Sequence, residues 1–107
     1  MYDSVAQVFD KGLPSRFNAD ESEGESASYL FHIIDVGFWR VDINNKRLTI
    51  AKDETAPADV EVTVTEKDFL DLANGEETLQ ILFMSGQLTL VGDLVIALKM
   101  VRFFPER

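Results

Sequence analysis

The amino-acid sequence predicts an α+β fold, in which helices cover one face of a β-sheet. Five short segments between residues 29 and 90 alternate apolar and polar residues with the period of two that is typical of strands. Segments at both ends of the chain instead place apolar residues at the spacing of helices. Because each segment has an apolar side, we expect two layers around one core.

The chain has 107 residues, which is close to the commonest size of a single domain, and we expect one domain over residues 1–107. Its net charge of −9 disfavours nucleic acid and anionic membrane surfaces as partners, since both are bound largely through Lys and Arg. No run approaches the roughly 18 apolar residues of a membrane span, so no integral membrane association is expected. We recognise neither a secretory signal nor a peroxisomal Ser-Lys-Leu ending, and expect an acidic cytoplasmic protein.

The N-terminal quarter of the chain predicts a helix and a loop. A short helix is expected over residues 3–9, with Asp3 or Ser4 as its cap and an interruption at residues 12–14, Gly-Leu-Pro. Residues 18–28 are acidic and poor in apolar side chains, which predicts a solvated loop with at most a helical turn.

Four strand signals follow in quick succession. Apolar side chains occupy alternate positions in residues 29–33 and 39–43, and the link at residues 35–37 is short enough for a hairpin. Residues 48–50 alternate in the same way, so we predict a three-stranded antiparallel meander. Residues 60–64, Val-Glu-Val-Thr-Val, predict a fourth strand with one wet face.

Two short helices are expected after the fourth strand. Thr65 and Asp68 resemble a capping box, so this strand should lead directly into a helix that ends at Asn74 and Gly75. A second helix begins near Thr78 and should stop at Gly86, a residue that takes positive φ without steric cost.

The last helix carries more apolar surface than a surface helix needs. It follows a fifth strand at residues 88–90, and Asp93 is its expected cap. One apolar stripe consists of Leu94, Leu98 and Val101, which we expect to face the sheet. The other consists of Ile96, Met100 and Phe103, which we expect to face neighbouring helices. The surplus requires another element, a partner chain or an apolar ligand.

The side chains that could carry out catalysis are few. His32 lies in an apolar strand signal, where a structural role is expected, and Ser85 lacks the Gly-x-Ser-x-Gly context of a nucleophile. The acidic residues 20–25 do not form a calcium-binding ladder, and Gly86 and Gly92 do not form a phosphate-binding loop. We therefore expect no enzymatic activity, no metal and no cofactor.

The second half of the sequence resembles the sterol carrier protein 2 family, also known as the sterol transfer domain family. The resemblance depends on several strings in a fixed order and spacing. They are Ala58 to Thr65, Asp68 to Leu72, Gly75, Phe83 to Leu90, Gly92 to Leu94 and Ala97 to Met100. Weaker similarity at Phe38 to Asp42 and at Leu13 to Asn18 extends the match over nearly the whole chain.

The resemblance implies a five-stranded mixed, mainly antiparallel sheet, with helices on one face that enclose an apolar tunnel. It implies fatty acyl chains, acyl-coenzyme A, isoprenoids or sterol-like molecules as ligands and no catalytic residues. Carried over by position, the lipid-binding residues are Trp39, Phe69, Leu72, Phe83, Met84, Leu94, Leu98, Met100 and Val101. The strong acidity, the short link at residues 35–37 and Glu77-Thr78 in place of the usual Asn-Pro depart from the peroxisomal members. With these departures, the chain resembles a short, stand-alone, prokaryotic member of the family, for which sterol is not the expected ligand.

Two main functions remain open from the sequence. The first is non-catalytic binding, and transfer, of an apolar lipid in a hydrophobic tunnel. The alternative is a protein interaction or dimerisation module accessory to a lipid-metabolising enzyme, in which the second stripe of the last helix docks on a partner enzyme or on its own copy and no lipid is bound. A third, an enzyme acting on acyl substrates, has no recognisable catalytic group here and stays open only because domains of the resembled family can be fused to, or accompany, lipid-metabolising enzymes.

Overall fold

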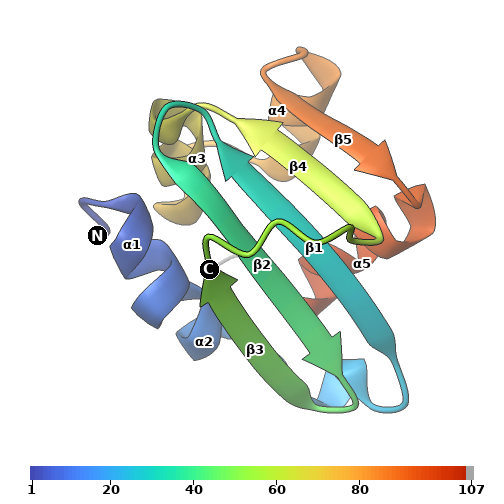
Figure 1. Cartoon of the computed structure of the whole chain (residues 1–107). Helices are drawn as coiled ribbons and strands as arrows, with labels where there is room; N and C mark the ends of the chain where they lie inside the picture. The colour runs from blue at the N-terminus through green and yellow to red at the C-terminus, as the bar shows by residue number, and fades with distance from the viewer. Residues whose placement is uncertain (106–107) are drawn as a thin grey trace.

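The computed structural model describes residues 1–105, which form a five-stranded sheet with all of its helices on one side (Figure 1). The strands are β1 (Ser26–Ile33), β2 (Gly37–Asn44), β3 (Arg47–Lys52), β4 (Val60–Val64) and β5 (Leu88–Gly92). Their order across the sheet is β3-β2-β1-β4-β5. The β1–β4 pair is parallel and the other three pairs are antiparallel. The α+β class and the mixed, mainly antiparallel sheet are thus confirmed.

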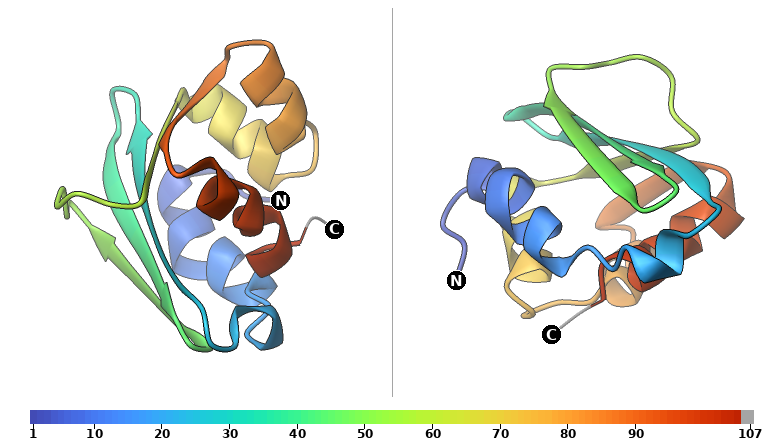
Figure 2. Two further views of the ribbon diagram at one scale, coloured as in Figure 1. Left: turned by 90° about the vertical axis from the view of Figure 1, so that its right-hand side faces the viewer. Right: turned by 90° about the horizontal axis from the view of Figure 1, so that it is seen from below.

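Short helical elements precede, interrupt and follow the sheet. They are α1 (Val5–Gln7), the π-helical turn η1 (Val8–Gly12), α2 (Leu13–Arg16), the 3-10 turn η2 (Asp20–Ser22), α3 (Glu66–Ala73), α4 (Leu79–Met84) and α5 (Leu94–Phe103). Seen along the sheet edge, the N-terminal helices and α3, α4 and α5 form a single layer against one sheet face (Figure 2). None of the helices described between residues 1 and 105 has the length and apolar character that a membrane crossing requires.

The strand pattern expected from the sequence places the core correctly. In β2, Trp39, Val41 and Ile43 are all buried, and the register sets Trp39 opposite Phe31 of β1. Phe31 in turn lies opposite Val62 of β4, whose alternate valines are also buried. An aromatic cluster forms over this part of the sheet, where the ring of Phe9 is stacked on Trp39 with centroids 4.8 Å apart.

The N-terminal helix runs further than the sequence indicated. Ser4 caps it as expected, by accepting a hydrogen bond from the Gln7 N–H at 3.2 Å. The expected interruption at residues 12–14 is wrong, because a π turn continues the helix and the Leu13 N–H donates to the Val8 carbonyl. Pro14 lies in the first turn of α2, directly after the π turn.

The acidic segment is anchored at one point. Ser22 lies in η2 and is fully buried. Its hydroxyl donates to the Ala19 carbonyl at 2.8 Å and accepts from the Lys46 N–H, in the β2–β3 turn, at 3.0 Å. β1 already begins at Ser26, inside the range that was expected to be a solvated loop, so this segment is shorter and more ordered than predicted.

The caps of the three later helices follow the sequence prediction. Thr65 accepts from the Asp68 N–H, and Thr78 accepts from the Ile81 N–H at 3.2 Å. Asp93 accepts from two backbone N–H groups at the start of α5, those of Val95 and Ile96. These contacts satisfy N–H groups that have no partner inside their own helix.

The orientation of α5 differs from the expectation. Ile96 is half-buried, and Met100 and Phe103, together with Ala97, are buried. The Leu94, Leu98 and Val101 stripe, which was expected to face the sheet, is exposed instead, with Leu98 69% exposed. The physical reason is that a ten-residue helix lying flat on the layer can bury only one stripe.

Candidate functional site

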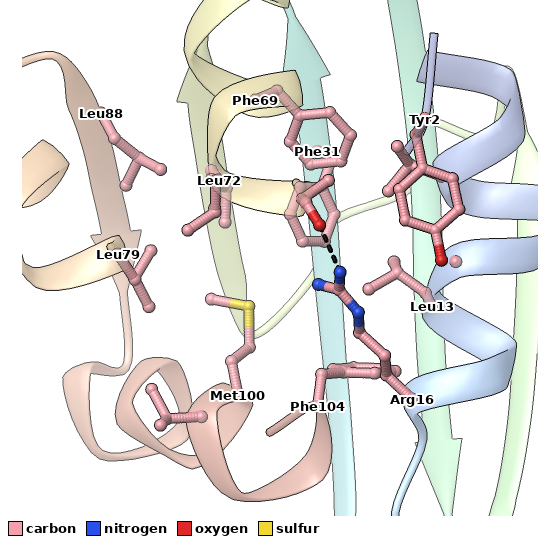
Figure 3. A pocket seen from close by; sticks show the side chains of 15 residues that line it. Tyr2, Leu13, Arg16, Phe31, Phe69, Leu72, Leu79, Leu88, Met100 and Phe104 are labelled. Atoms are coloured by element: carbon pink, nitrogen blue, oxygen red, sulfur yellow. Dashed lines mark hydrogen bonds between the residues drawn. The ribbon is translucent and has the colours of Figure 1, made fainter. Parts of the chain in front are cut away.

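An apolar cavity lies between the sheet and the helical layer (Figure 3). Its volume is about 90 Å³. The lining residues come from η1, α2, α3, α4 and α5, from the segments next to α1 and α5, and from the strands β1, β4 and β5. They are Tyr2, Val8, Gly12, Leu13, Arg16, Phe31, Val62, Phe69, Leu72, Ala73, Leu79, Leu88, Met100, Val101 and Phe104.

The sheet supplies the floor of this cavity. Phe31 and Val62 are register partners on the parallel β1–β4 pair, so their side chains lie side by side on the face that the helices cover. Phe69, from α3, packs against Phe31 with the ring centroids 5.9 Å apart. The aromatic cluster therefore closes one wall, while Met100 on α5 lies across from Leu72 on α3 (Figure 3).

The cavity is smaller than a lipid. An engineered protein cavity of about 150 Å³ holds a molecule of the size of benzene, and this cavity has about 90 Å³. An acyl chain or a ring system therefore fits only if the surrounding helices move apart. The tunnel expected from the sequence therefore stays a prediction.

The N-terminal segment and the end of α3 are joined beside the cavity. The Tyr2 N–H donates to the Asn74 side-chain oxygen at 2.7 Å, and the Asn74 Nδ2 donates to the Tyr2 carbonyl at 3.0 Å. Nη2 of Arg16 donates to the carbonyl of Ala73, the last residue of α3. These hydrogen bonds tie the N-terminal helices to α3, and they would have to adjust if the two elements separated.

Arg16 is the cation among the lining residues. Its guanidinium lies 5.7 Å from the centroid of the Tyr2 ring, at a distance typical of a cation–π contact. Its Nε is buried and has no hydrogen-bond partner among residues 1–105. A buried donor without a partner is costly, so this atom is an unfavourable feature of the cavity wall.

Four of the nine residues expected to bind lipid line the cavity: Phe69, Leu72, Met100 and Val101. The other five lie elsewhere. Trp39 is buried in the aromatic cluster, on the far side of Phe9 from Phe69. The remaining four are exposed on α4 and α5 and are Phe83, Met84, Leu94 and Leu98.

The exposed apolar residues of the C-terminal third form a surface of their own. We call the stripe of Leu94, Leu98 and Val101 the outer α5 face; Val95, also on α5, is exposed as well. Val101 belongs both to this face and to the cavity lining, so the two apolar surfaces are continuous at that residue.

Sequence reasoning did not place the N-terminal contribution to the cavity. Tyr2, Leu13 and Arg16 all line it, and Phe104, near the C-terminus, is a further lining residue that was not expected. The available signal was the weak family similarity at residues 13–18, which contains Leu13 and Arg16. Nothing in the local pattern indicated that the arginine would point inward.

The described residues hold few groups suited to catalysis or metal binding. No cluster of three or more His, Asp or Glu side chains within residues 1–105 could hold a metal ion. His32 does not line the cavity, and its ring stacks on Phe38 at 4.4 Å. The structural role expected for this histidine is consistent with that contact.

The fold and the cavity define an α+β domain with an apolar pocket between its sheet and its helices. The sequence matches the model of the SCP-2 sterol transfer family over residues 11–105, and the chain belongs to that family. Human hydroxysteroid dehydrogenase-like protein 2 is 31% identical over 90 residues, which are 81% of this chain and 22% of that protein. The chain thus spans less than a quarter of the length of this relative.

Solved structures show the same fold in two settings. Palmitated SCP2L2 from Aedes aegypti matches with a TM-score of 0.77 and 23% identity, over 98% of this chain and 97% of that one. A double mutant of the sec-alkyl sulfatase PisA1, an enzyme from Pseudomonas sp., matches with a TM-score of 0.86 and 20% identity. That match covers 98% of this chain and 17% of the sulfatase chain. The fold therefore occurs both as a separate domain and as a part of a larger enzyme.

Proposed function

We propose that this chain binds an apolar lipid, without catalysis, in the cavity between the sheet and the helices, and carries it between sites. The observation that supports this most is the cavity itself, which has an almost entirely apolar lining in a member of a sterol transfer family. Fatty acyl chains, acyl-coenzyme A, isoprenoids and sterol-like molecules are the ligand classes to compare. A relative solved in a palmitated form makes a fatty acyl chain the first of these to test.

The hydrophobic effect provides the driving force for this binding. Burying about 300 Å² of apolar ligand surface contributes about 7.5 kcal/mol at roughly 25 cal/mol per Å². Ordering the ligand and opening the helical layer subtract from that value, so affinity in the micromolar range is the upper expectation.

The test is uptake of a fluorescent fatty acid by two matched variants. Leu72 lines the cavity from α3, whereas Leu98 lies on the outer α5 face. Leu72→Glu should abolish uptake and Leu98→Glu should leave it nearly unchanged, with both variants folded by circular dichroism. Unchanged uptake in folded Leu72→Glu would contradict the cavity as the site. Loss in Leu98→Glu alone would instead place the ligand on the outer α5 face.

A second candidate function is a protein interaction module, and the exposed outer α5 face favours it. Contiguous apolar surface on a folded protein commonly marks an interaction site. In the alkylsulfatase, the matching domain is 17% of a longer chain, so this fold is compatible with covalent attachment to an enzyme. Sedimentation velocity of the purified chain tests the idea. A stable dimer that Leu98→Glu dissociates, with no uptake of any hydrophobic probe, would favour this function over lipid binding.

A further inference from the structure

β5 forms an open edge of the sheet, because it is the last strand in the order and no described strand pairs with its outer side (Figure 1). Across the β4–β5 ladder, the Asp93 N–H donates to the Asp59 carbonyl at 3.0 Å. Alternate residues of an antiparallel strand direct their N–H and C=O groups to the same neighbour, so the odd-numbered residues of β5 bond to β4. The main-chain groups of the even-numbered residues point away from the sheet and have no hydrogen-bond partner among residues 1–105. These residues are Leu88, Leu90 and Gly92.

The two edges of the sheet differ in charge. β3, at the opposite edge, carries the exposed Arg47 and Lys52 at its two ends. Charged side chains on an edge strand are a common device against pairing with another chain. β5 has no charged residue, and Asp93 is the one charged residue in the range 79–98, although 27% of the whole chain is charged. The β5 edge therefore lacks the protection that the β3 edge has.

Exposed apolar side chains gather around this unprotected edge. Eight of the eleven large hydrophobic side chains that are exposed within residues 1–105 lie on α4, β5 and α5. They are Ile81, Phe83, Met84, Val91, Leu94, Val95, Leu98 and Val101. The left view of Figure 2 looks onto the β5 edge, and α4 and α5 lie towards the viewer on this side of the molecule. The open edge and most of the exposed apolar surface therefore share one side of the molecule.

We propose that two copies of this chain form a dimer in which their β5 strands pair antiparallel. A twofold axis at Leu90, perpendicular to the sheet, sets Leu90 of each copy opposite Leu90 of the other, and Leu88 of each copy opposite Gly92 of the other. All three positions have outward main-chain groups, so this register forms about six backbone hydrogen bonds. The same axis keeps both helical layers on one side of the joined sheet and places α4 of each copy beside α5 of the other. The dimer goes beyond lipid binding in the cavity and does not depend on it.

The size and the charge of this surface suit a second copy of the chain. A half-exposed apolar side chain of this size presents about 100 Å², so eight of them present about 800 Å², which is what each partner contributes to a standard interface. The contact uses the same patch on both copies, as a twofold interface requires. Two chains with a net charge of −9 repel each other, and an interface almost free of charged side chains keeps the like charges apart.

Sedimentation velocity over a range of protein concentrations tests for the dimer, and amide hydrogen exchange tests for the strand pairing. The wild-type chain should sediment as a dimer at about 100 μM and dissociate on dilution. Association should be tighter at higher salt, because salt screens the charge repulsion between the copies. In the dimer, the N–H groups of Leu88, Leu90 and Gly92 should exchange at least about tenfold more slowly than in the monomer.

The β3 edge provides an internal control for the exchange measurement. The Asp53 N–H donates to the Phe38 carbonyl at 2.8 Å, so the odd-numbered residues of β3 bond to β2. The N–H groups of Leu48 and Ile50 therefore point outward, as those of Leu88 and Leu90 do on β5. Their exchange should be the same in the monomer and in the dimer.

A matched pair of variants locates the interface with little disturbance of the fold. Val91 is exposed on β5, and Val36 is exposed in the turn between β1 and β2. Val91→Glu and Val36→Glu add the same charge to the chain. In the dimer, the two carboxylates that Val91→Glu introduces would be diagonal neighbours about 7–8 Å apart across the axis, and they would repel each other. Val91→Glu should raise the dimer Kd at least about tenfold, and Val36→Glu should change it by less than about threefold.

Three results would overturn the inference. The first is a chain that stays monomeric up to about 1 mM. The second is a dimer that leaves the exchange of the β5 edge unchanged, or that Val36→Glu weakens as much as Val91→Glu, because its interface would lie elsewhere. The third is a monomer that floats with phosphatidylcholine vesicles unless it carries Val91→Glu, which would assign this surface to a lipid bilayer. Uptake of a fluorescent fatty acid is measured separately, so failure of the dimer leaves the proposed lipid binding intact.

Discussion

Gly92, between β5 and α5, is the position where adding a single methyl group should damage the fold most. Its φ is +124°, and a Cβ at this residue would lie 2.2 Å from the Asp59 carbonyl oxygen. That oxygen accepts a hydrogen bond from the Asp93 N–H at 3.0 Å, immediately before α5. Gly86 is the matched control, because its φ is +80° and nothing lies within 4 Å of the position of a Cβ.

The contact of the added Cβ with the Asp59 carbonyl oxygen should therefore make Gly92→Ala less stable than Gly86→Ala. Both incur the cost of a left-handed conformation, about 1–2 kcal/mol. Gly92→Ala additionally forces the β4–β5 edge apart and weakens the Asp93 to Asp59 bond. Overpacking costs about 1–3 kcal/mol, and a lost hydrogen bond costs about 0.5–1.5 kcal/mol. We expect Gly92→Ala to be less stable than Gly86→Ala by at least about 2 kcal/mol, or at least about 8 °C in Tm.

Urea denaturation followed by the fluorescence of the buried Trp39 measures this difference directly. The control is the free energy of unfolding of Gly86→Ala under the same conditions. A difference below about 1 kcal/mol between the two variants would show that the chain relaxes around the added methyl group. The reasoning from the Asp59 contact would then be wrong.

Three further predictions concern the core and the charged groups. Burial, with smaller contributions from nearby acidic groups, raises the pKa of the Tyr29 phenol above its ordinary value of 10.0. The free energy of unfolding should therefore be constant below about pH 10 and fall above it, because only the unfolded chain ionises there. Tyr29→Phe should remove this alkaline loss in denaturation curves and cost about 1 kcal/mol at neutral pH, since the hydroxyl donates to the Ile96 carbonyl at 2.7 Å. Phe9→Ala should lower the free energy of unfolding by about 3–5 kcal/mol in urea titrations, because this ring is buried at the centre of the aromatic cluster; a loss under 1.5 kcal/mol would contradict that packing. The hydrogen bond from Lys99 lowers the pKa of Glu25. The stability that this pair contributes is therefore present above pH 4.5 and lost as the pH falls through the lowered pKa. In Lys99→Met, the free energy of unfolding should depend less on pH in this acidic range.

The strands could be predicted because a half-buried strand alternates apolar residues, which face the core, with polar residues, which face water. Trp39, Val41 and Ile43 alternate with polar residues, and each of the three is buried as predicted. The helix caps at Thr65 and Asp93 could also be predicted, because their side chains accept hydrogen bonds from backbone groups only a few residues away. Local chemistry sufficed in both cases.

The orientation of α5 could not be predicted by the same reasoning. Both stripes are apolar, so the pattern allows either one to face inward. The choice depends on where the chain leaves β5, and that is fixed by the close approach of Gly92 to Asp59, a contact 33 residues apart in sequence. For this reason Leu94 and Leu98, two of the nine residues expected to bind lipid, lie on the exposed side of α5 and not in the cavity lining.

The sequence also could not predict that Arg16 would line the cavity. Arginine is rarely buried, and its default interpretation is a solvated surface residue. Its contact with Ala73 joins residues 57 positions apart, and the two are brought together by the packing of the N-terminal helical elements against α3.

The π turn η1 affects the direction in which the Arg16 side chain points. Such a turn holds one residue more than an α-helical turn, and each residue advances a helix by about 100°. Deleting one residue from Val8–Gly12 and restoring an α-helical path would therefore leave the direction of the following residues nearly unchanged, because the wider turn absorbs the extra residue. An α-helical path that kept all five residues would instead turn Arg16 by about a quarter of a turn away from α3. The direction of this cation is therefore governed by the width of one helical turn as well as by the identity of the residue itself.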